Sequence, residues 1–216
     1  MGRLFESRLD AARQLAEALA AYRGRNPLLL AIPRGAVPMA AEIARALEGE
    51  FDVVLVRKLR APGAPELAVG AVDETGWTYV AGHAAEVGAD AAWIAREKAE
   101  QLALLRRRRE RYTPARPPVD PAGRIAIVVD DGIATGASMI AALHAVRAKN
   151  PARLVCAAPV ASPGSLARVR AHADEVVCLA APEDFTAVGQ FYRDFSQVED
   201  DEVIALLARG REDSGR

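Results

Sequence analysis

The segment RIAIVVDDGIATGAS, residues 124–138, carries the strongest local pattern in the chain. Its apolar run is typical of a buried strand, and two adjacent carboxylates, Asp130 and Asp131, follow the run at once. A turn of small and hydroxyl-bearing residues then leads into a helix predicted over residues 137–149. Unpaired backbone N–H groups and the positive dipole end at a helix N-terminus favour an anion such as phosphate. The segment therefore predicts a strand, an acidic pair and an anion-binding loop in direct succession.

Strands and helices alternate on both sides of this segment, which is typical of α/β proteins with a parallel sheet. Strands are predicted over residues 28–32, 51–58, 124–131, 154–160 and 175–179, with a third strand or a small hairpin formed by AVGAVDE and WTYVA around residues 74–76. Helices are predicted over residues 4–22, from Pro38 to 47, and over 89–111, 137–149 and 164–172. We therefore expect a Rossmann-like parallel sheet with flanking helices in one domain covering residues 1–216.

Composition excludes several classes of function. The chain has 216 residues, of which 51% are hydrophobic and 26% charged, and its 28 basic and 29 acidic residues leave a net charge of -1. That balance lacks the electrostatic footprint of a dedicated nucleic-acid or membrane-surface binder. No apolar run is long enough for a membrane span and the N-terminus does not have the form of a signal peptide, so we expect a cytoplasmic protein. Cys156 and Cys178 lie in apolar runs without metal-ligand spacing and are expected to be buried, reduced thiols.

A second strand-loop-helix segment, AIPRGAVP at residues 31–38, has the same form as the first. Its loop holds Arg34 and Gly35, which offer backbone donors and a guanidinium suited to phosphate oxygens. Because ligands collect at the carboxyl ends of strands in parallel sheets, we expect the two loops to form two anion sites along one edge.

VVDDGIATGAS, residues 128–138, closely resembles the phosphoribosyl-pyrophosphate signature of the type I phosphoribosyltransferases. LLLAIPRGAVPMAAEIA, residues 28–44, resembles the pyrophosphate loop of that family, in the expected order. The resemblance spans about residues 28–160. It implies a type I phosphoribosyltransferase fold with a core over about residues 25–180, a helical insertion over about 85–120 and a C-terminal hood over about 181–210. It also implies a pentosyltransferase of nucleotide metabolism that uses phosphoribosyl pyrophosphate and Mg²⁺.

The resemblance also implies roles for individual residues. Asp130 and Asp131 would bind the ribose hydroxyls of the donor and act on the metal indirectly, through the donor or water. The loop residues would cradle the 5-phosphate; these are Ala134, Thr135, Gly136, Ala137 and Ser138. Arg34 and Gly35 would receive the pyrophosphate, in a loop that often has unusual peptide geometry in this family. Arg57, Lys58 and Arg60 match in position the basic residues that the family uses on pyrophosphate and in its mobile loop, although charged residues at a strand end are commonly just solvated.

Two further segments carry expectations about the reaction. RAPGAPELAVG, residues 60–70, is a candidate lid that would exclude water, with Glu66 as a proton acceptor. The predicted helix over 89–111 departs from the minimal family pattern, and its four consecutive arginines, 106–109, are expected to form a solvated face. His83, His144 and His172 fall on no metal spacing and receive no role.

The acceptor is not identified by any pattern in the chain. Phe185, Phe191, Tyr192 and Phe195 cluster near the C-terminus; one could stack on a flat base, although packing onto the sheet is the simpler role for each. We expect small-molecule substrates, no membrane and no nucleic-acid partner, and we leave a homodimer open. The alternatives are a regulator that senses phosphoribosyl pyrophosphate or nucleotides and binds nucleic acid, and a sensor or synthase-like relative that consumes the same donor differently.

Overall fold

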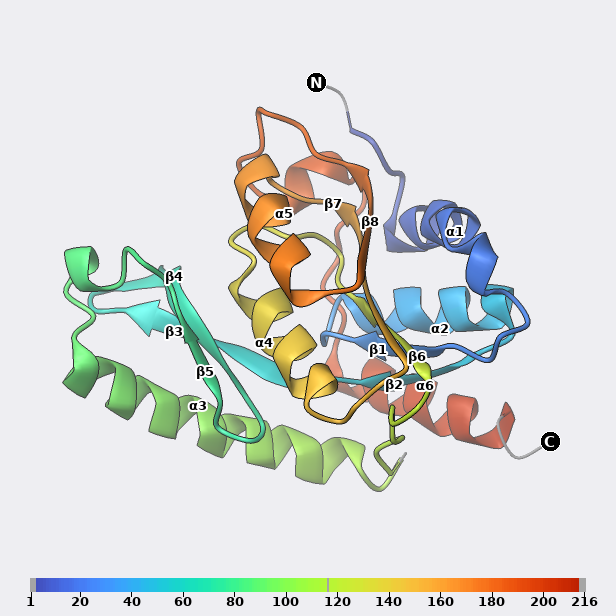
Figure 1. Ribbon diagram of the computed structural model, residues 1–216, viewed down its shortest axis with the longest axis horizontal. Coiled ribbons are helices and arrows are strands. Elements are labelled where there is room, and N and C mark those ends of the chain that lie inside the picture. Colours follow the sequence, from blue (N-terminus) through green and yellow to red (C-terminus); the bar gives the residue numbers. More distant parts are fainter. Residues whose placement is uncertain (1–2, 116, 214–216) are drawn as a thin grey trace.

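A parallel five-stranded sheet forms the centre of the protein (Figure 1), with the spatial order β2-β1-β6-β7-β8. The computed structural model describes residues 3–115 and 117–213. The strands of the sheet are β1 (Leu28–Ala31), β2 (Glu50–Val53), β6 (Ile125–Val129), β7 (Arg153–Val160) and β8 (Glu175–Ala180). All neighbouring pairs are parallel, which confirms the predicted α/β architecture.

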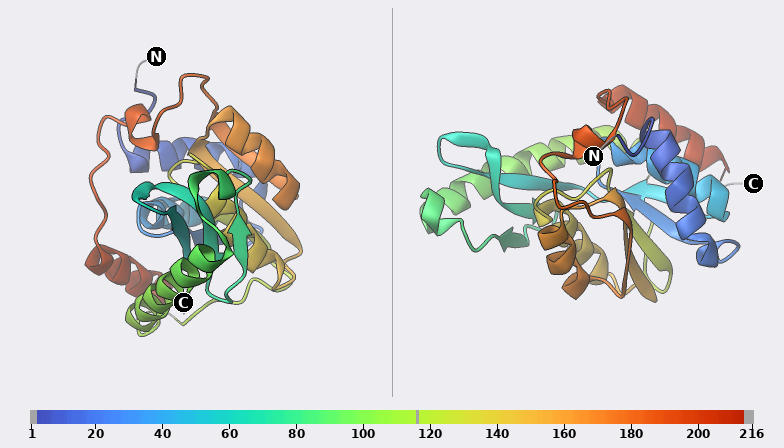
Figure 2. Two further views of the ribbon diagram at one scale, coloured as in Figure 1. Left: turned by 90° about the vertical axis from the view of Figure 1, so that its left-hand side faces the viewer. Right: turned by 90° about the horizontal axis from the view of Figure 1, so that it is seen from above.

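Helices cover both faces of this sheet (Figure 2). One face carries α1 (Arg8–Ala18), α2 (Ala36–Leu47) and α6 (Asp200–Asp213), and the other carries α4 (Ala137–Arg147) and α5 (Pro163–Val169). Successive side chains of a strand point to opposite faces, so Leu29 packs with the first group of helices and Leu30 with the second. The short 3-10 helices are η1 (Ala20–Tyr22), η2 (Ala85–Val87), η3 (Arg170–His172) and η4 (Val188–Phe191).

The winding of the sheet reverses between β1 and β6. From β1 the chain passes through α2 to β2 on one side, and from β6 it passes through α4 to β7 on the other side. The loops that follow β1 and β6 therefore diverge, and they leave a crevice at the carboxyl ends of these two strands. Both predicted anion loops begin at this point.

The part of the chain that connects β2 to β6 forms an arm that projects away from the sheet (Figure 1). It contains an antiparallel sheet and a long helix, namely β3 (Val56–Ala61), β4 (Ala64–Asp73), β5 (Thr78–Val80) and α3 (Ala91–Tyr112). β4 and β5 form the small hairpin that the sequence predicts as one of two options, and α3 is the predicted helical insertion. Arg106 and Arg107 are exposed, as expected, but Arg108 and Arg109 are half-buried. The prediction of a solvated face is therefore wrong for half of the arginine run.

Several predicted elements have different bounds in the structure, and two of these differences bear on the arm and on the loop after β1. The strand predicted over residues 51–58 is wrong as a single element, because the chain leaves the parallel sheet after Val53 and begins the arm at Val56. The apolar run does not mark this break, since Val54 and Leu55 are themselves buried. Helix α2 begins at Ala36, two residues before the predicted start, and Pro38 lies within its first turn as the sequence predicts. No helix in the described ranges combines the length and apolar character needed to cross a membrane.

Candidate active site

The two anion loops line one cavity at the switch point of the sheet. Its volume is about 360 Å³. The loop after β1 contributes Ile32 and Pro33, and the loop after β6 with the start of α4 contributes residues 130–136, Ser138 and Met139. Arg8 of α1, Lys58 of β3, and Val188 and Phe195 of the C-terminal segment complete the wall. Segments far apart in the sequence therefore meet around the acidic pair.

The two carboxylates of the acidic pair have different partners. Asp130 Oδ1 accepts a hydrogen bond from its neighbour's backbone N–H at 2.9 Å, and Asp131 Oδ2 accepts one from Arg8 Nε at 2.8 Å. Burial, followed by the charge of Asp131, raises the pKa of Asp130 well above its ordinary value. Burial also raises the pKa of Asp131, against the opposing charge of Arg8. A cation or a hydroxyl donor placed beside this pair would relieve both effects.

The loop between β6 and α4 is braced from the side of α5. The hydroxyls of Ser162 and Ser165 donate to the carbonyl oxygen of Ala134 at 2.9 and 2.5 Å, and Arg168 Nη2 donates to the carbonyl oxygen of Thr135 at 3.0 Å. Gly136 precedes α4 with a φ of 78°, a left-handed conformation that glycine adopts without strain. The loop carbonyls are thereby bound, and the first N–H groups of α4 have no acceptor within the helix. Sequence reasoning missed these braces because they lie in a different strand-helix unit.

The loop after β1 lies directly against the acidic pair. Its Pro33–Arg34 peptide bond is cis, as the resemblance leads one to expect of this loop. A Cβ atom added to Gly35 would lie 2.1 Å from Asp131 Oδ2, well inside van der Waals contact. Only glycine fits at this position, and so the close approach of the two loops explains why the sequence has it there.

The predicted basic residues have three different surroundings: the cavity for Lys58, the arm for Arg57 and Arg60, and the carboxylate before α6 for Arg34. Lys58 lines the cavity, and its charge opposes the rise in the pKa of Asp130. Arg34 Nη1 turns to Glu199 Oε2 at 2.8 Å. Arg57 Nε donates to Gln101 at 2.5 Å, and Arg60 Nε to Glu97 at 2.7 Å, both on α3. The structure therefore brings Lys58 to the acidic pair and holds Arg57 and Arg60 against the arm helix.

Arg8 is the site residue that sequence reasoning missed. Besides Asp131, it binds the carbonyl oxygen of Ser196 through Nη1 at 2.6 Å, and its guanidinium carbon lies 3.8 Å from the centre of the Phe195 ring. Its side chain is only 13% exposed. In an amphipathic N-terminal helix an arginine is ordinarily solvated, and no local signal links residue 8 to residue 131.

The C-terminal aromatic residues mostly pack against the body of the protein. Phe191 and Tyr192 are buried, Phe185 lies 5.3 Å from the Phe191 ring, and the Tyr192 hydroxyl donates to the carbonyl oxygen of Asp131 at 2.6 Å. Phe195 differs, because it is 36% exposed and lines the cavity. Among these four side chains, Phe195 is therefore the candidate for contact with a flat acceptor.

Comparison with known proteins agrees with this geometry. A family model described as "Phosphoribosyl transferase domain" matches residues 4–196, which is most of the chain. The chain belongs to this family. The matched range includes the cavity, both loops and the arm, and it ends just before the segment that leads into α6.

Relatives within the phosphoribosyl transferase family cover nearly the whole chain. "Putative phosphoribosyl transferase MT0597" and "Putative phosphoribosyl transferase Rv0571c", from two strains of Mycobacterium tuberculosis, are each 45% identical over 212 residues. The match covers 98% of this chain and 48% of each relative, so the chain spans about half the length of these curated relatives. The crystal structure of TT1426 from Thermus thermophilus is 48% identical with a TM-score of 0.80, and the match covers 97% of this chain and 99% of that one.

Proposed function

We propose that the protein transfers ribose 5-phosphate from phosphoribosyl pyrophosphate to a nitrogen acceptor, most simply a nucleobase, and releases pyrophosphate. The observation that carries the proposal is the meeting of the acidic pair, the α4 loop and the Gly35 loop around one cavity. In this arrangement the α4 N-terminus would bind the 5-phosphate and the carboxylates would accept hydrogen bonds from the ribose hydroxyls. The Arg34–Gly35 loop would bind the pyrophosphate.

The residues present also suit Mg²⁺ as the accompanying ion. Asp130 and Asp131 offer hard carboxylate oxygens that would act on the ion indirectly, through the donor or water, since Mg²⁺ usually keeps several waters and is bound together with substrate phosphates. Within residues 3–115 and 117–213 no group of three or more His, Cys, Asp or Glu side chains is placed to hold a metal, and we assign the direct ligands of the ion to the donor and water. When bound, the ion supplies positive charge that stabilises the departing pyrophosphate.

The chain's own groups would then act through charge and position. Negative charge grows on the pyrophosphate as it leaves. Lys58 is a cation that lines the cavity, and Arg34 is a cation of the loop after β1 whose side chain pairs with Glu199 in the free protein. The ion pair between Arg8 and Asp131 would fix the orientation of the Asp131 carboxylate before the donor arrives. Phe195, which lines the same cavity, would contact the flat face of the acceptor. Glu66 is exposed on β4, and residues 60–70 stay our candidate lid.

A panel of acceptors tests this function directly. The protein would be mixed with phosphoribosyl pyrophosphate, Mg²⁺ and each of a series of purine and pyrimidine bases, and both pyrophosphate and the nucleotide product would be measured. We expect release of pyrophosphate and formation of a nucleotide with at least one base. Lys58→Met should lower kcat/KM by about tenfold or more, because it removes a cation from the site of developing charge.

The regulatory alternative predicts a different result from the same material. No turnover with any base, together with binding to nucleic acid that weakens steeply with salt, would replace the transferase proposal by a nucleic-acid-binding regulator. Exchange of labelled pyrophosphate without added base would instead indicate a relative that consumes the donor in another way.

A further inference from the structure

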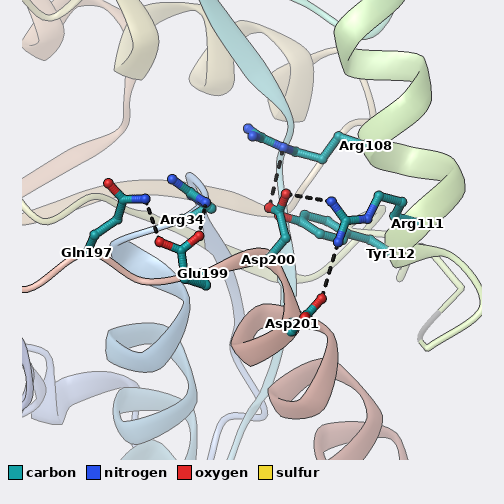
Figure 3. Close-up of polar contacts among 8 residues, drawn as sticks. All are labelled: Arg34, Arg108, Arg111, Tyr112, Gln197, Glu199, Asp200 and Asp201. Atoms are coloured by element: carbon teal, nitrogen blue, oxygen red, sulfur yellow. Dashed lines mark hydrogen bonds and ion pairs between the residues drawn. The ribbon is translucent and has the colours of Figure 1, made fainter.

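Arg34, the cation of the candidate pyrophosphate loop, is already paired with a carboxylate in the free protein. Its Nη1 atom lies 2.8 Å from Glu199 Oε2 (Figure 3). The other oxygen of Glu199 accepts a hydrogen bond from Gln197 Nε2 at 2.5 Å. Arg34 is 27% exposed and Glu199 is 63% exposed, so water and ions can reach this pair. In the free protein, the Glu199 carboxylate therefore binds the same guanidinium to which the proposed function assigns the pyrophosphate.

The next residue in the chain fixes where Glu199 lies. Asp200 begins α6 and is held by the end of α3 (Figure 3). Its Oδ1 accepts a hydrogen bond from the Tyr112 hydroxyl at 2.5 Å and its Oδ2 one from Arg111 Nη1 at 2.9 Å, while Arg108 Nε lies 3.8 Å from Oδ1. Tyr112 is fully buried, so this anchor is rigid. The arm helix and α6 together hold Glu199 opposite the Arg34 loop.

The charges around this anchor favour a carboxylate next to Arg34. Burial opposes the ionisation of Asp200, but Tyr112 and the neighbouring arginines lower its pKa below the ordinary value. Glu199, Asp200 and Asp201 are consecutive acids, and Arg34, Arg108 and Arg111 face them. The range matched by the family model ends at residue 196, so this acidic segment, residues 199–201, lies outside the part that defines the family.

We propose that Glu199 competes with the donor's pyrophosphate for Arg34, and so lowers the affinity of this protein for both the donor and the pyrophosphate product. The inference rests on the proposed function. Before binding, the carboxylate keeps Arg34 neutralised and in place. Pyrophosphate displaces it on entry, and the carboxylate returns to Arg34 as the product leaves. Glu199 is thus a residue that sets affinity and release without touching the reacting atoms.

The test compares Glu199→Gln with the unaltered protein by calorimetric titration with inorganic pyrophosphate in the presence of Mg²⁺. We expect Glu199→Gln to bind pyrophosphate about two- to fivefold more tightly, the effect ordinarily found for a partly exposed ion pair. The gain should shrink at about 0.5 M salt, where exposed charges are screened. Equal melting temperatures would exclude a change in folding as the cause.

Two further variants separate the contact from general charge. Asp201→Asn removes a negative charge two positions away that pairs with Arg111 and is 94% exposed, and it should leave pyrophosphate affinity unchanged. In an Arg34→Gln background, Glu199→Gln should give no gain, because the competing pair no longer exists. An equal gain from Asp201→Asn, or a gain that persists without Arg34, would overturn the inference.

The outcomes also distinguish this inference from the proposed function. Pyrophosphate binding that is the same, or weaker, in Glu199→Gln overturns the competition and leaves the transferase proposal in place. Absence of pyrophosphate and donor binding in every variant, including the unaltered protein, overturns the donor site and the inference with it.

Discussion

Asp130 and Asp131 are adjacent at one strand end but differ in their consequences for stability. Asp131 is balanced by Arg8, whereas Asp130 accepts only a backbone hydrogen bond and has its pKa raised the more strongly. A carboxyl whose pKa is higher in the folded than in the unfolded chain binds its proton more tightly when folded. Its ionisation therefore costs stability as the pH rises above the unfolded value. The arrangement of the acidic pair therefore suits a ligand but lowers the stability of the protein without ligand.

Asp130→Asn should stabilise the free protein at neutral pH while weakening donor binding. The amide keeps the hydrogen bond from the backbone of residue 131 and removes the unfavourable charge, which we expect to raise the free energy of unfolding by about 1 kcal/mol. Urea unfolding at several pH values measures this. Below the ordinary value of 3.8 the two proteins should converge, because the carboxyl is then protonated in both states. A variant less stable at pH 8 would contradict the assignment.

Arg8→Met should destabilise the protein through Asp131. The side chains of Arg8 and Asp131 are 13% and 15% exposed, so removal of Arg8 leaves a largely buried carboxylate without its counter-charge. We expect the free energy of unfolding, measured in urea, to fall by about 2–4 kcal/mol. Arg193→Met is the matched control, because Arg193 pairs with Glu6 and both side chains are about two-thirds or more exposed. Arg8→Met with Asp131→Asn should recover part of the loss. No recovery would mean that Arg8 acts through packing on Phe195 instead.

Residues of the candidate site were predictable from the sequence only where they lie in one local pattern. Asp130, Thr135 and Gly35 follow strands and open helices, and this position in a parallel sheet is enough to select them. Arg8 lies in α1 and Glu199 directly precedes α6, at opposite ends of the chain, and their roles depend on partners more than a hundred residues away. Spacing along the chain carries no information about such pairs.

At the scale of elements, the arm is held together by polar contacts beneath α3. Glu97 is 5% exposed and accepts hydrogen bonds from the backbone and side chain of Arg60 and from Gln101. Burial opposes the ionisation of Glu97, but these bonds lower its pKa below the ordinary 4.5. Its charge therefore stabilises the arm above that pH, and the contribution is lost as the pH falls through the lowered pKa.

Glu97→Gln should loosen β3 and β4 without affecting the parallel sheet. It weakens a buried, charge-assisted contact, and we expect amide hydrogen exchange in β3 and β4 to speed up by about tenfold, with β1 and β6 unchanged. Glu100→Gln is the control, because Glu100 lies 3.7 Å from Arg60 and is 68% exposed. Faster exchange throughout the molecule would instead show that arm and sheet unfold together.

Most elements were predictable, because they have a clear period and clear end signals, although no helix is predicted from the sequence where α6 lies. The failure at residues 51–58 has a physical cause. β2 pairs with β1, and β3 pairs with β4, so the division of one apolar run depends on the strands that each half meets. Residues 53 to 56 are buried throughout, and burial alone gives no sign of a change of partner.

At the scale of the whole molecule, the C-terminal helix is part of the core although it lies beyond the family match. Val203 and Leu207 of α6 are fully buried in the cluster that contains α1 and α2. Leu207→Ala should lower the free energy of unfolding by about 2–4 kcal/mol, because it leaves a cavity. Leu206→Ala, on the half-buried side of the helix, should cost about 1 kcal/mol or less. Equal effects in denaturant unfolding would contradict this packing.

The adjacency of β1 and β6 has a consequence for the order in which the chain folds. Leu28 to Ala31 pair with residues 126–129, and the whole arm is synthesised between them. The arm's strands are near neighbours in sequence, so their pairing closes short loops and can begin early. The edge of β1 that pairs with β6 stays unpaired until β6 has left the ribosome. Pairing of strands so far apart in the chain closes a long loop, which is entropically costly. We therefore expect an incomplete chain to hold a formed arm beside an open sheet, and to gain the ability to bind phosphate in a single late step.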